Sequence, residues 1–327
     1  MKTLIVLLCM TSFLHAASPE EDAKSIAPAA IESQEIASLE IMPLLQQQSS
    51  LSLDILPPLP PAKKAPWVAA TLGFFPGLGH VYLEDPITAG ALLGTAGGGM
   101  ILAESIKKNE SLLNAVDATT MASIWYSPYA AYRDARLMNG SSHYSYQMPT
   151  DSLMDLTLAP FRWEIIKKPE VWGGVLGCLT AATLIGTLAS NVSLSACRAS
   201  TGLDTFCALP VGVGEEAFFR GYLQSAISEV SNPVAGTILS SILFGAAHFP
   251  NGGSLSNDGA WRFHAFILPL ITGIGAYCGW LTHKTHSLQA SVALHTWYDF
   301  IIFLGRSLAK ERAAITTPKT FSFSTAF

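Results

Sequence analysis

The stretch Glu215-Glu216-Ala217-Phe218-Phe219-Arg220 places two carboxylates and a guanidinium inside an apolar segment that covers residues 203–231. Charged side chains are costly in the hydrocarbon of a membrane, and those found there usually serve a function. The apolar setting predicts a membrane helix. The three charges predict a functional site within it.

The composition of the whole chain is that of a membrane protein. Its 327 residues are 50% hydrophobic and only 13% charged, whereas soluble domains carry about a quarter charged residues. The mean hydropathy is +0.35. A formal net charge of -5, without a dense block of Lys and Arg, excludes nucleic acid as a partner. The five cysteines are scattered and form no Cys-x-x-Cys pair, so neither a disulfide framework nor a thiolate zinc site is expected.

Apolar segments recur from residue 67 onward, and most are close to the ~20 residues that cross a bilayer as a helix. A backbone that faces lipid must satisfy its own hydrogen bonds, which selects helices for runs of this kind. The sequence therefore predicts an all-α, polytopic transmembrane helical bundle, an integral multi-pass protein of the bacterial inner membrane in contact with the lipid bilayer. The expected segments are 67–83, broken near Pro76 and Gly77, then 86–104, 113–131, 171–193, 203–231, 233–249, 263–281 and 288–305.

Changes of composition divide the chain into six parts. The first begins with Met1-Lys2 and continues through an apolar run to small residues, which is typical of a signal peptide or an N-terminal anchor. Basic residues lie both before residue 170 and after residue 305, so the orientation in the membrane stays open. The expected parts are the signal peptide or anchor 1–17, a polar and Pro-rich linker 18–66, N-terminal membrane helices 67–132, a polar loop 133–170, a bundle 171–305 that carries the charged motif, and a tail 306–327.

Two later motifs supply further polar groups in apolar surroundings: Phe244-Gly-Ala-Ala-His248 and His295-Thr-Trp-Tyr-Asp299. On a helix, residues four apart share a face, which brings Asp299 next to His295. By the same spacing Glu216 pairs with Arg220, while Glu215 projects about 100° away from Glu216 and is left available as a general base.

The order of the predicted helices brings the three motifs to similar depths on one side of the membrane, so that a single cavity could collect them. Two imidazoles, His248 and His295, together with Glu215 or Asp299, would suit Zn²⁺ with an open position for water. The same groups would also hold the water and the developing oxyanion directly, without a metal. The spacing does not choose between these two mechanisms.

The three motifs resemble those of the CPBP family of intramembrane proteases, also called CAAX prenyl protease type 2 or Abi proteins, over about residues 211–304. Their pattern is Glu-Glu-x-x-x-Arg, Phe-x-x-x-His and His-x-x-x-Asn/Asp in that order, and here it is complete. The resemblance implies that Glu215 activates water, that Glu216 and Arg220 structure the site, and that His248, His295 and Asp299 bind a metal or stabilise the oxyanion. Trp297, between the two polar residues of its motif, is a candidate for lining the cavity.

The predicted function is therefore an intramembrane endopeptidase that hydrolyses a peptide bond near the membrane surface, with a peptide or protein substrate in or near the membrane. An alternative is a catalytically silent scaffold or a bacteriocin-immunity protein. In that case the pair of Glu216 and Arg220 would only lock helices together. A transporter that uses the buried charges as an ion path ranks last, because the sequence has no visible pair of corresponding halves.

Overall fold

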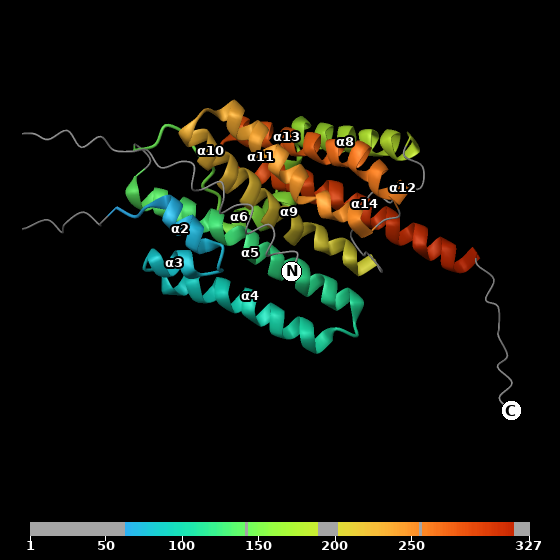
Figure 1. Ribbon diagram of the computed structural model, residues 1–327, viewed down its shortest axis with the longest axis horizontal. Coiled ribbons are helices and arrows are strands. Elements are labelled where there is room, and N and C mark those ends of the chain that lie inside the picture. Colours follow the sequence, from blue (N-terminus) through green and yellow to red (C-terminus); the bar gives the residue numbers. More distant parts are fainter. Residues whose placement is uncertain (1–62, 141–142, 189–201, 255–256, 317–327) are drawn as a thin grey trace, which may run out of the picture. The chain divides into compact units, whose positions relative to one another are not determined.

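The computed structural model describes residues 63–140, 143–188, 202–254 and 257–316 (Figure 1). All regular secondary structure within these ranges is helical, which confirms the all-α prediction. The expected signal peptide or anchor 1–17, most of the linker 18–66 and the end of the tail lie outside the described residues.

The first helices form a group of their own at the N-terminal side of the described chain. The predicted break in the segment 67–83 separates α2 from α3. It is centred on Gly77, whose φ of 88° lies in the left-handed region. A Cβ atom at Gly77 would lie 2.4 Å from the carbonyl oxygen of Ala89, so only glycine fits there. The helices are α2 (Pro66–Gly73), α3 (Leu78–Tyr82), α4 (Pro86–Ile106) and α5 (Glu110–Asn139).

The stretch 133–170, expected to be a polar loop, is largely helical. Helix α5 continues to Asn139 because its arginines are paired inside the protein: Arg136, for example, donates to the carbonyl oxygen of Tyr146 at 2.7 Å. A capping box of Ser152 and Asp155 then starts a new helix, and the Ser152 hydroxyl lowers the pKa of Asp155. The short helices here are α6 (Leu153–Leu158), η3 (Ala159–Phe161) and α7 (Trp163–Ile166).

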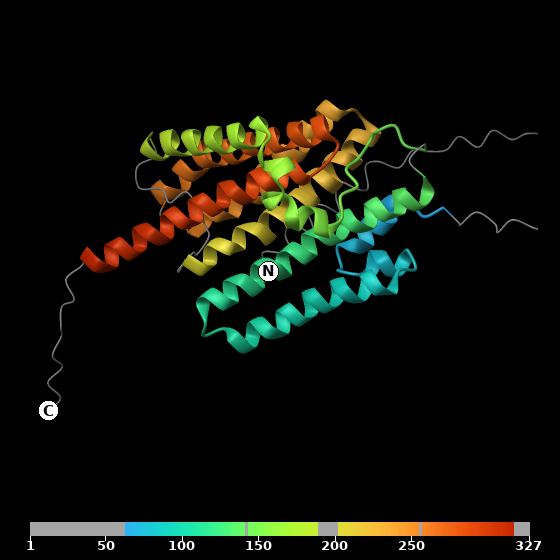
Figure 2. The ribbon, with the colours of Figure 1, turned by 180° about the vertical axis from the view of Figure 1, so that it is seen from behind.

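The remaining helices form the C-terminal bundle. Helix α14 lies beside α9 and α8, and α11 lies against α13, as Figures 1 and 2 both show. Helix α14 continues past residue 305, where the bundle was expected to end. The elements are α8 (Pro169–Leu188), η4 (Gly202–Cys207), α9 (Ala208–Glu216), the π-helix η5 (Ala217–Gln224), α10 (Ser225–Val230), α11 (Pro233–Ala247), η6 (Phe249–Ser254), α12 (Asn257–Arg262), the π-helix η7 (Phe263–Ile267), α13 (Leu268–Thr285) and α14 (Gln289–Thr316).

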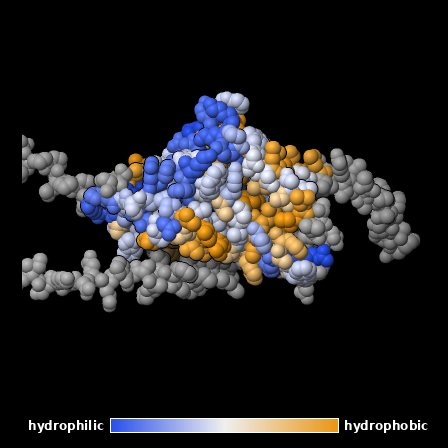
Figure 3. All heavy atoms as spheres, turned by 90° about the horizontal axis from the view of Figure 1, so that it is seen from above, coloured by the Kyte–Doolittle hydropathy of each residue, from blue (hydrophilic) through white to orange (hydrophobic). Residues whose placement is uncertain are grey.

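Three of the described helical stretches are long and apolar enough to cross a membrane: Pro86–Ile106, Pro233–Gly252 and Gly259–Thr285. Large apolar side chains such as Ile101 and Ile242 are exposed on them, and Figure 3 shows hydrophobic residues gathered beside a hydrophilic region. Such exposure suits a surface in contact with lipid. The protein is therefore a membrane protein.

An apolar core fixes α14 between its neighbours. It contains Val175 of α8, Cys278 and Leu281 of α13, and Ala293 and Leu294 of α14, all of them almost completely buried. Two of these residues directly precede His295, so the packing of this core determines where the imidazole lies.

Candidate active site

Two glycines allow helix α9 to approach its neighbours closely just before the two glutamates. A Cβ atom at Gly212 would lie 2.7 Å from Oγ1 of Thr296 on α14, and one at Gly214 would lie 2.6 Å from Cα of Ala122 on α5. Such short distances leave no room for a side chain. Helix α9 therefore packs with its backbone against both helices, which brings Glu215 and Glu216 next to α14.

Glu216 is completely buried and is bound on two sides. Its Oε1 atom lies 3.0 Å from Nη1 of Arg220, which is also completely buried, and 2.7 Å from Nδ1 of His295. The predicted pair of Glu216 and Arg220 is present, although the chain between the two residues belongs to a π-helix. The carboxylate thus compensates the buried guanidinium and orients the imidazole.

The other ring nitrogen of His295 faces two further carboxylates. Nε2 lies 3.8 Å from Oε2 of Glu215 and 3.5 Å from Oδ2 of Asp299. The side chains of Glu215 and Asp299 are 23% and 17% exposed, so both remain accessible to water. His295 is therefore held at Nδ1 by the buried Glu216, while its Nε2 lies near Glu215, on the side of the ring that water can reach.

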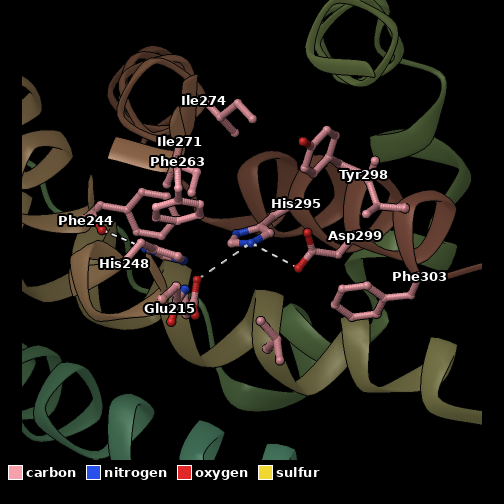
Figure 4. Close-up of a pocket in the computed structure, with 13 residues that line it drawn as sticks. Glu215, Phe244, His248, Phe263, Ile271, Ile274, His295, Tyr298, Asp299 and Phe303 are labelled. Atoms are coloured by element: carbon pink, nitrogen blue, oxygen red, sulfur yellow. Dashed lines mark hydrogen bonds and ion pairs between the residues drawn. The ribbon is translucent and has the colours of Figure 1, made fainter. Parts of the chain in front are cut away.

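His248 comes from a different helix and points into the same space (Figure 4). It is the C-cap residue of α11, and its Nδ1 lies 2.8 Å from the carbonyl oxygen of Phe244, one turn earlier. Since a carbonyl oxygen can only accept, Nδ1 is the donor in this hydrogen bond. The Nε2 atom is left for a ligand, as in many histidines whose second nitrogen acts on a substrate or a metal.

The four groups line one cavity of about 240 Å³. Its wall is polar at Glu215, His248, His295 and Asp299 and mainly apolar elsewhere, a common composition for a ligand site. The other lining residues are Val211, Phe244, Asn251, Phe263, Ile271, Ile274, Tyr298, Ile302 and Phe303.

Arg220 lies behind this wall and does not line the cavity. Its guanidinium carbon lies 4.2 Å from the centre of the Phe244 ring, a cation–π contact. Phe244 lines the cavity and accepts the hydrogen bond from His248. Arg220 thus supports two sides of the site, through Glu216 and through Phe244.

The expected zinc ligands are close together but are not arranged as a metal site. Among the described residues, no group of three or more His, Cys, Asp or Glu side chains is placed so that it could hold a metal ion. Nδ1 of His248 and Nδ1 of His295 are both engaged in hydrogen bonds. Zinc binding by His248 and His295 therefore stays a prediction.

The structure also identifies lining residues that the sequence motifs did not. Asn251 follows His248 in η6, and Phe263 lies in the π-helix η7. Tyr298 also lines the cavity, and its place next to Asp299 in the third motif is the sequence feature from which this could have been predicted. Trp297, which was expected to line the cavity, instead donates its Nε1 hydrogen to the carbonyl oxygen of Pro160 at 3.0 Å and packs on Trp172.

Comparison with known families agrees with this geometry. Residues 200–301 match the family model described as type II CAAX prenyl endopeptidase Rce1-like. The match contains all three motifs, confirms the resemblance to the CPBP intramembrane proteases, and supports a CAAX-type endopeptidase, which is a hydrolase. Neither a curated protein nor a solved structure matches the chain.

Proposed function

We propose that this protein, a member of the CPBP family of intramembrane proteases, hydrolyses a peptide bond of a substrate in or near the membrane surface by means of a water molecule that Glu215 activates. The observation that supports this best is the single cavity lined by Glu215, His248, His295 and Asp299. We further propose that the chain crosses the bacterial inner membrane several times.

Glu215 is the proposed general base. Glu216 is already bound by Arg220 and His295, whereas Glu215 reaches the accessible side of the site, 3.8 Å from Nε2 of His295. A water molecule between Glu215 and His295 would be within hydrogen-bond reach of both, which is the geometric requirement for general base catalysis.

In the proposed reaction, the Glu215 carboxylate takes a proton from this water while the water oxygen attacks the carbonyl carbon of the substrate. The carbonyl oxygen becomes an oxyanion. His295 and His248, which both line the cavity, are the proposed groups that stabilise it. Because their Nδ1 atoms already donate to Glu216 and to the Phe244 carbonyl oxygen, each ring does so as an imidazolium whose Nε2–H donates to the oxyanion. When the C–N bond breaks, the Glu215 carboxyl group returns the proton to the leaving amine, so that protons and charge balance.

Glu216 and Asp299 are proposed to act through His295. The hydrogen bond of 2.7 Å from Nδ1 of His295 to Glu216 fixes the plane of the ring. Asp299, whose Oδ2 lies 3.5 Å from Nε2, places a negative charge beside the imidazole ring. Their proposed role is to orient the imidazole and to stabilise positive charge on it.

Replacing Glu215 by Gln tests the proposal, since it keeps the volume of the side chain and removes the base. Purified protein in detergent is incubated with a mixture of synthetic peptides, and new peptide termini are identified by mass spectrometry. We expect Glu215→Gln to abolish all cleavage that the wild-type protein shows. Glu164→Gln, a change at an exposed glutamate of α7, serves as the control and should leave cleavage unchanged.

Equal cleavage by wild-type protein and Glu215→Gln at equal amounts of folded protein would contradict the mechanism. If neither protein cleaved any peptide, and cells with Glu215→Gln had the same phenotype as cells with the wild-type protein, the alternative of a catalytically silent scaffold would be favoured.

A further inference from the structure

The start of helix α14, which carries His295 and Asp299, is held by a residue far away in the sequence. The first N–H groups of a helix have no partner within the helix and need acceptors from elsewhere. The buried carboxylate of Asp151 accepts from the backbone N–H of Leu288 at 2.7 Å, from Oγ of Ser287 at 2.9 Å and from Nε2 of Gln289 at 2.8 Å. One side chain thus binds three consecutive residues at this helix start.

The backbone of Asp151 is itself fixed to helix α5. Its carbonyl oxygen accepts from the hydroxyl of Tyr129 at 3.0 Å and from Nη1 of Arg133 at 2.6 Å. The same Tyr129 hydroxyl lies 3.3 Å from the carbonyl oxygen of Pro149. Asp151 therefore links α14 to α5 through hydrogen bonds at both its side chain and its backbone.

Helix α9, which carries Glu215 and Glu216, rests on the same helix α5. The contact is the close approach of Gly214 to Ala122 described above, where a Cβ atom would lie 2.6 Å from Cα of Ala122. The two halves of the candidate site are the glutamates on α9 and the imidazole on α14. Both are thus positioned by contacts with α5, directly for α9 and through Asp151 for α14.

Two further contacts of the segment 147–162, which we call the strap, reach α14. Arg162 donates to Oε1 of Gln289 at 2.9 Å, and the carbonyl oxygen of Pro160 accepts from Nε1 of Trp297 at 3.0 Å. Trp297 stands between His295 and Asp299 in the sequence. The strap therefore contacts α14 at its start and again at the level of the site.

We infer that Asp151 is a positioning residue for the proposed hydrolysis: by holding the start of α14 against α5, it sets the distance between His295 and Glu215. The inference rests on the proposed function. His295 lies seven residues after Leu288, about two helical turns or ~10 Å along a stiff helix, so a shift at the start reaches the imidazole. Asp151 does not belong to the lining of the cavity.

The test compares Asp151→Asn and Asp151→Ala with wild-type protein. The peptide that the wild-type protein cleaves in the assay above is the probe, and kcat and KM are measured separately. A misplacement of ~1 Å costs up to about 100-fold in rate. We expect kcat to fall about 10- to 100-fold for Asp151→Ala and less for Asp151→Asn, whose amide oxygen still accepts from Leu288, with KM unchanged within twofold.

Asp85→Ala is the matched control. Asp85 caps α4 by accepting from the N–H of Thr88 at 3.0 Å, and α4 lines no part of the cavity. This control should lower the melting temperature by removing a helix cap, yet leave kcat unchanged. If Asp151 contributed only to stability, Asp151→Ala would behave like Asp85→Ala, with a lower melting temperature and an unchanged kcat.

Amide hydrogen exchange gives a readout that does not depend on catalysis. We expect Asp151→Ala to speed the exchange of the amides of residues 288–296, and Asp85→Ala to leave them unchanged. Unchanged exchange at these amides, or unchanged kcat in Asp151→Ala, would overturn the inference. If the wild-type protein cleaves no peptide, the proposed function fails, while the exchange data still decide whether Asp151 fixes α14. Should Asp151→Ala not fold, the same criteria apply to Asp151→Asn.

Discussion

The buried pair of Glu216 and Arg220 should be strongly coupled in stability. Both side chains are completely buried and their closest atoms, Oε1 and Nη1, are 3.0 Å apart. At this distance two unit charges attract by ~5 to 6 kcal/mol if the effective dielectric constant is about 20. Removal of one partner leaves the other charge buried without compensation, which typically costs ~3 to 5 kcal/mol.

We therefore predict that Glu216→Gln and Arg220→Met each lower the free energy of unfolding by ~3 to 5 kcal/mol. Arg220→Met should lie at the lower end, because Glu216 keeps its hydrogen bond of 2.7 Å to His295. The double variant should lose clearly less than the sum of the two, since it contains neither of the isolated charges.

The measurement is denaturant unfolding in detergent micelles, followed by tryptophan fluorescence, for the four proteins of the double-mutant cycle. The partly exposed pair of Lys284 and Glu170, with 2.6 Å between Nζ and Oε1, provides a control cycle whose effects should be additive. Additivity within about 0.5 kcal/mol for Glu216 and Arg220 would refute the reasoning, because it would mean that the two charges do not compensate each other.

Two further predictions concern packing around the site and metal content. Gly275→Ala on α13 should destabilise the protein by ~1 to 3 kcal/mol, because its Cβ would lie 2.7 Å from Nη2 of Arg220 and 2.9 Å from Cδ1 of Phe244. Gly273→Ala on the same helix meets nothing within 4 Å and should be neutral or slightly stabilising, as melting temperatures in detergent would reveal. The metal-assisted form of the mechanism predicts one zinc per purified chain that is lost in His248→Ala and His295→Ala, as elemental analysis would show. Active wild-type protein purified without zinc would contradict it and favour the mechanism in which the side chains act alone.

The sequence predicted the local relations within the site well. The spacing of four residues brings Arg220 to Glu216 and Asp299 to His295, and the structure has both neighbours at 3.0 and 3.5 Å. Such relations follow from the geometry of one helix and need no knowledge of the fold. The motif order also suggested that His248 joins the same cavity, which it does.

Relations between distant segments were not predictable in this way. The polar composition of 133–170 indicated a loop. The segment is largely helical because its polar side chains find partners inside the protein, such as the carbonyl oxygen of Tyr146 for Arg136. The sequence carries no signal for such pairings, nor for the binding of Leu288 by Asp151, 137 residues earlier. The π-helix at 217–224 also has no sequence signal in a single chain, although π-helical turns are frequent at functional sites.

The close contact between Gly214 and Ala122 has a consequence for engineering. A graft of residues 200–301 into another scaffold would carry every charged group of the three motifs, but it would leave behind both the surface under α9 and the carboxylate of Asp151. In the new scaffold nothing would fix the position of α9 relative to α14. The smallest portable unit of this site therefore begins at α5 and includes about ninety residues, 110–199, upstream of the region that matches the family model.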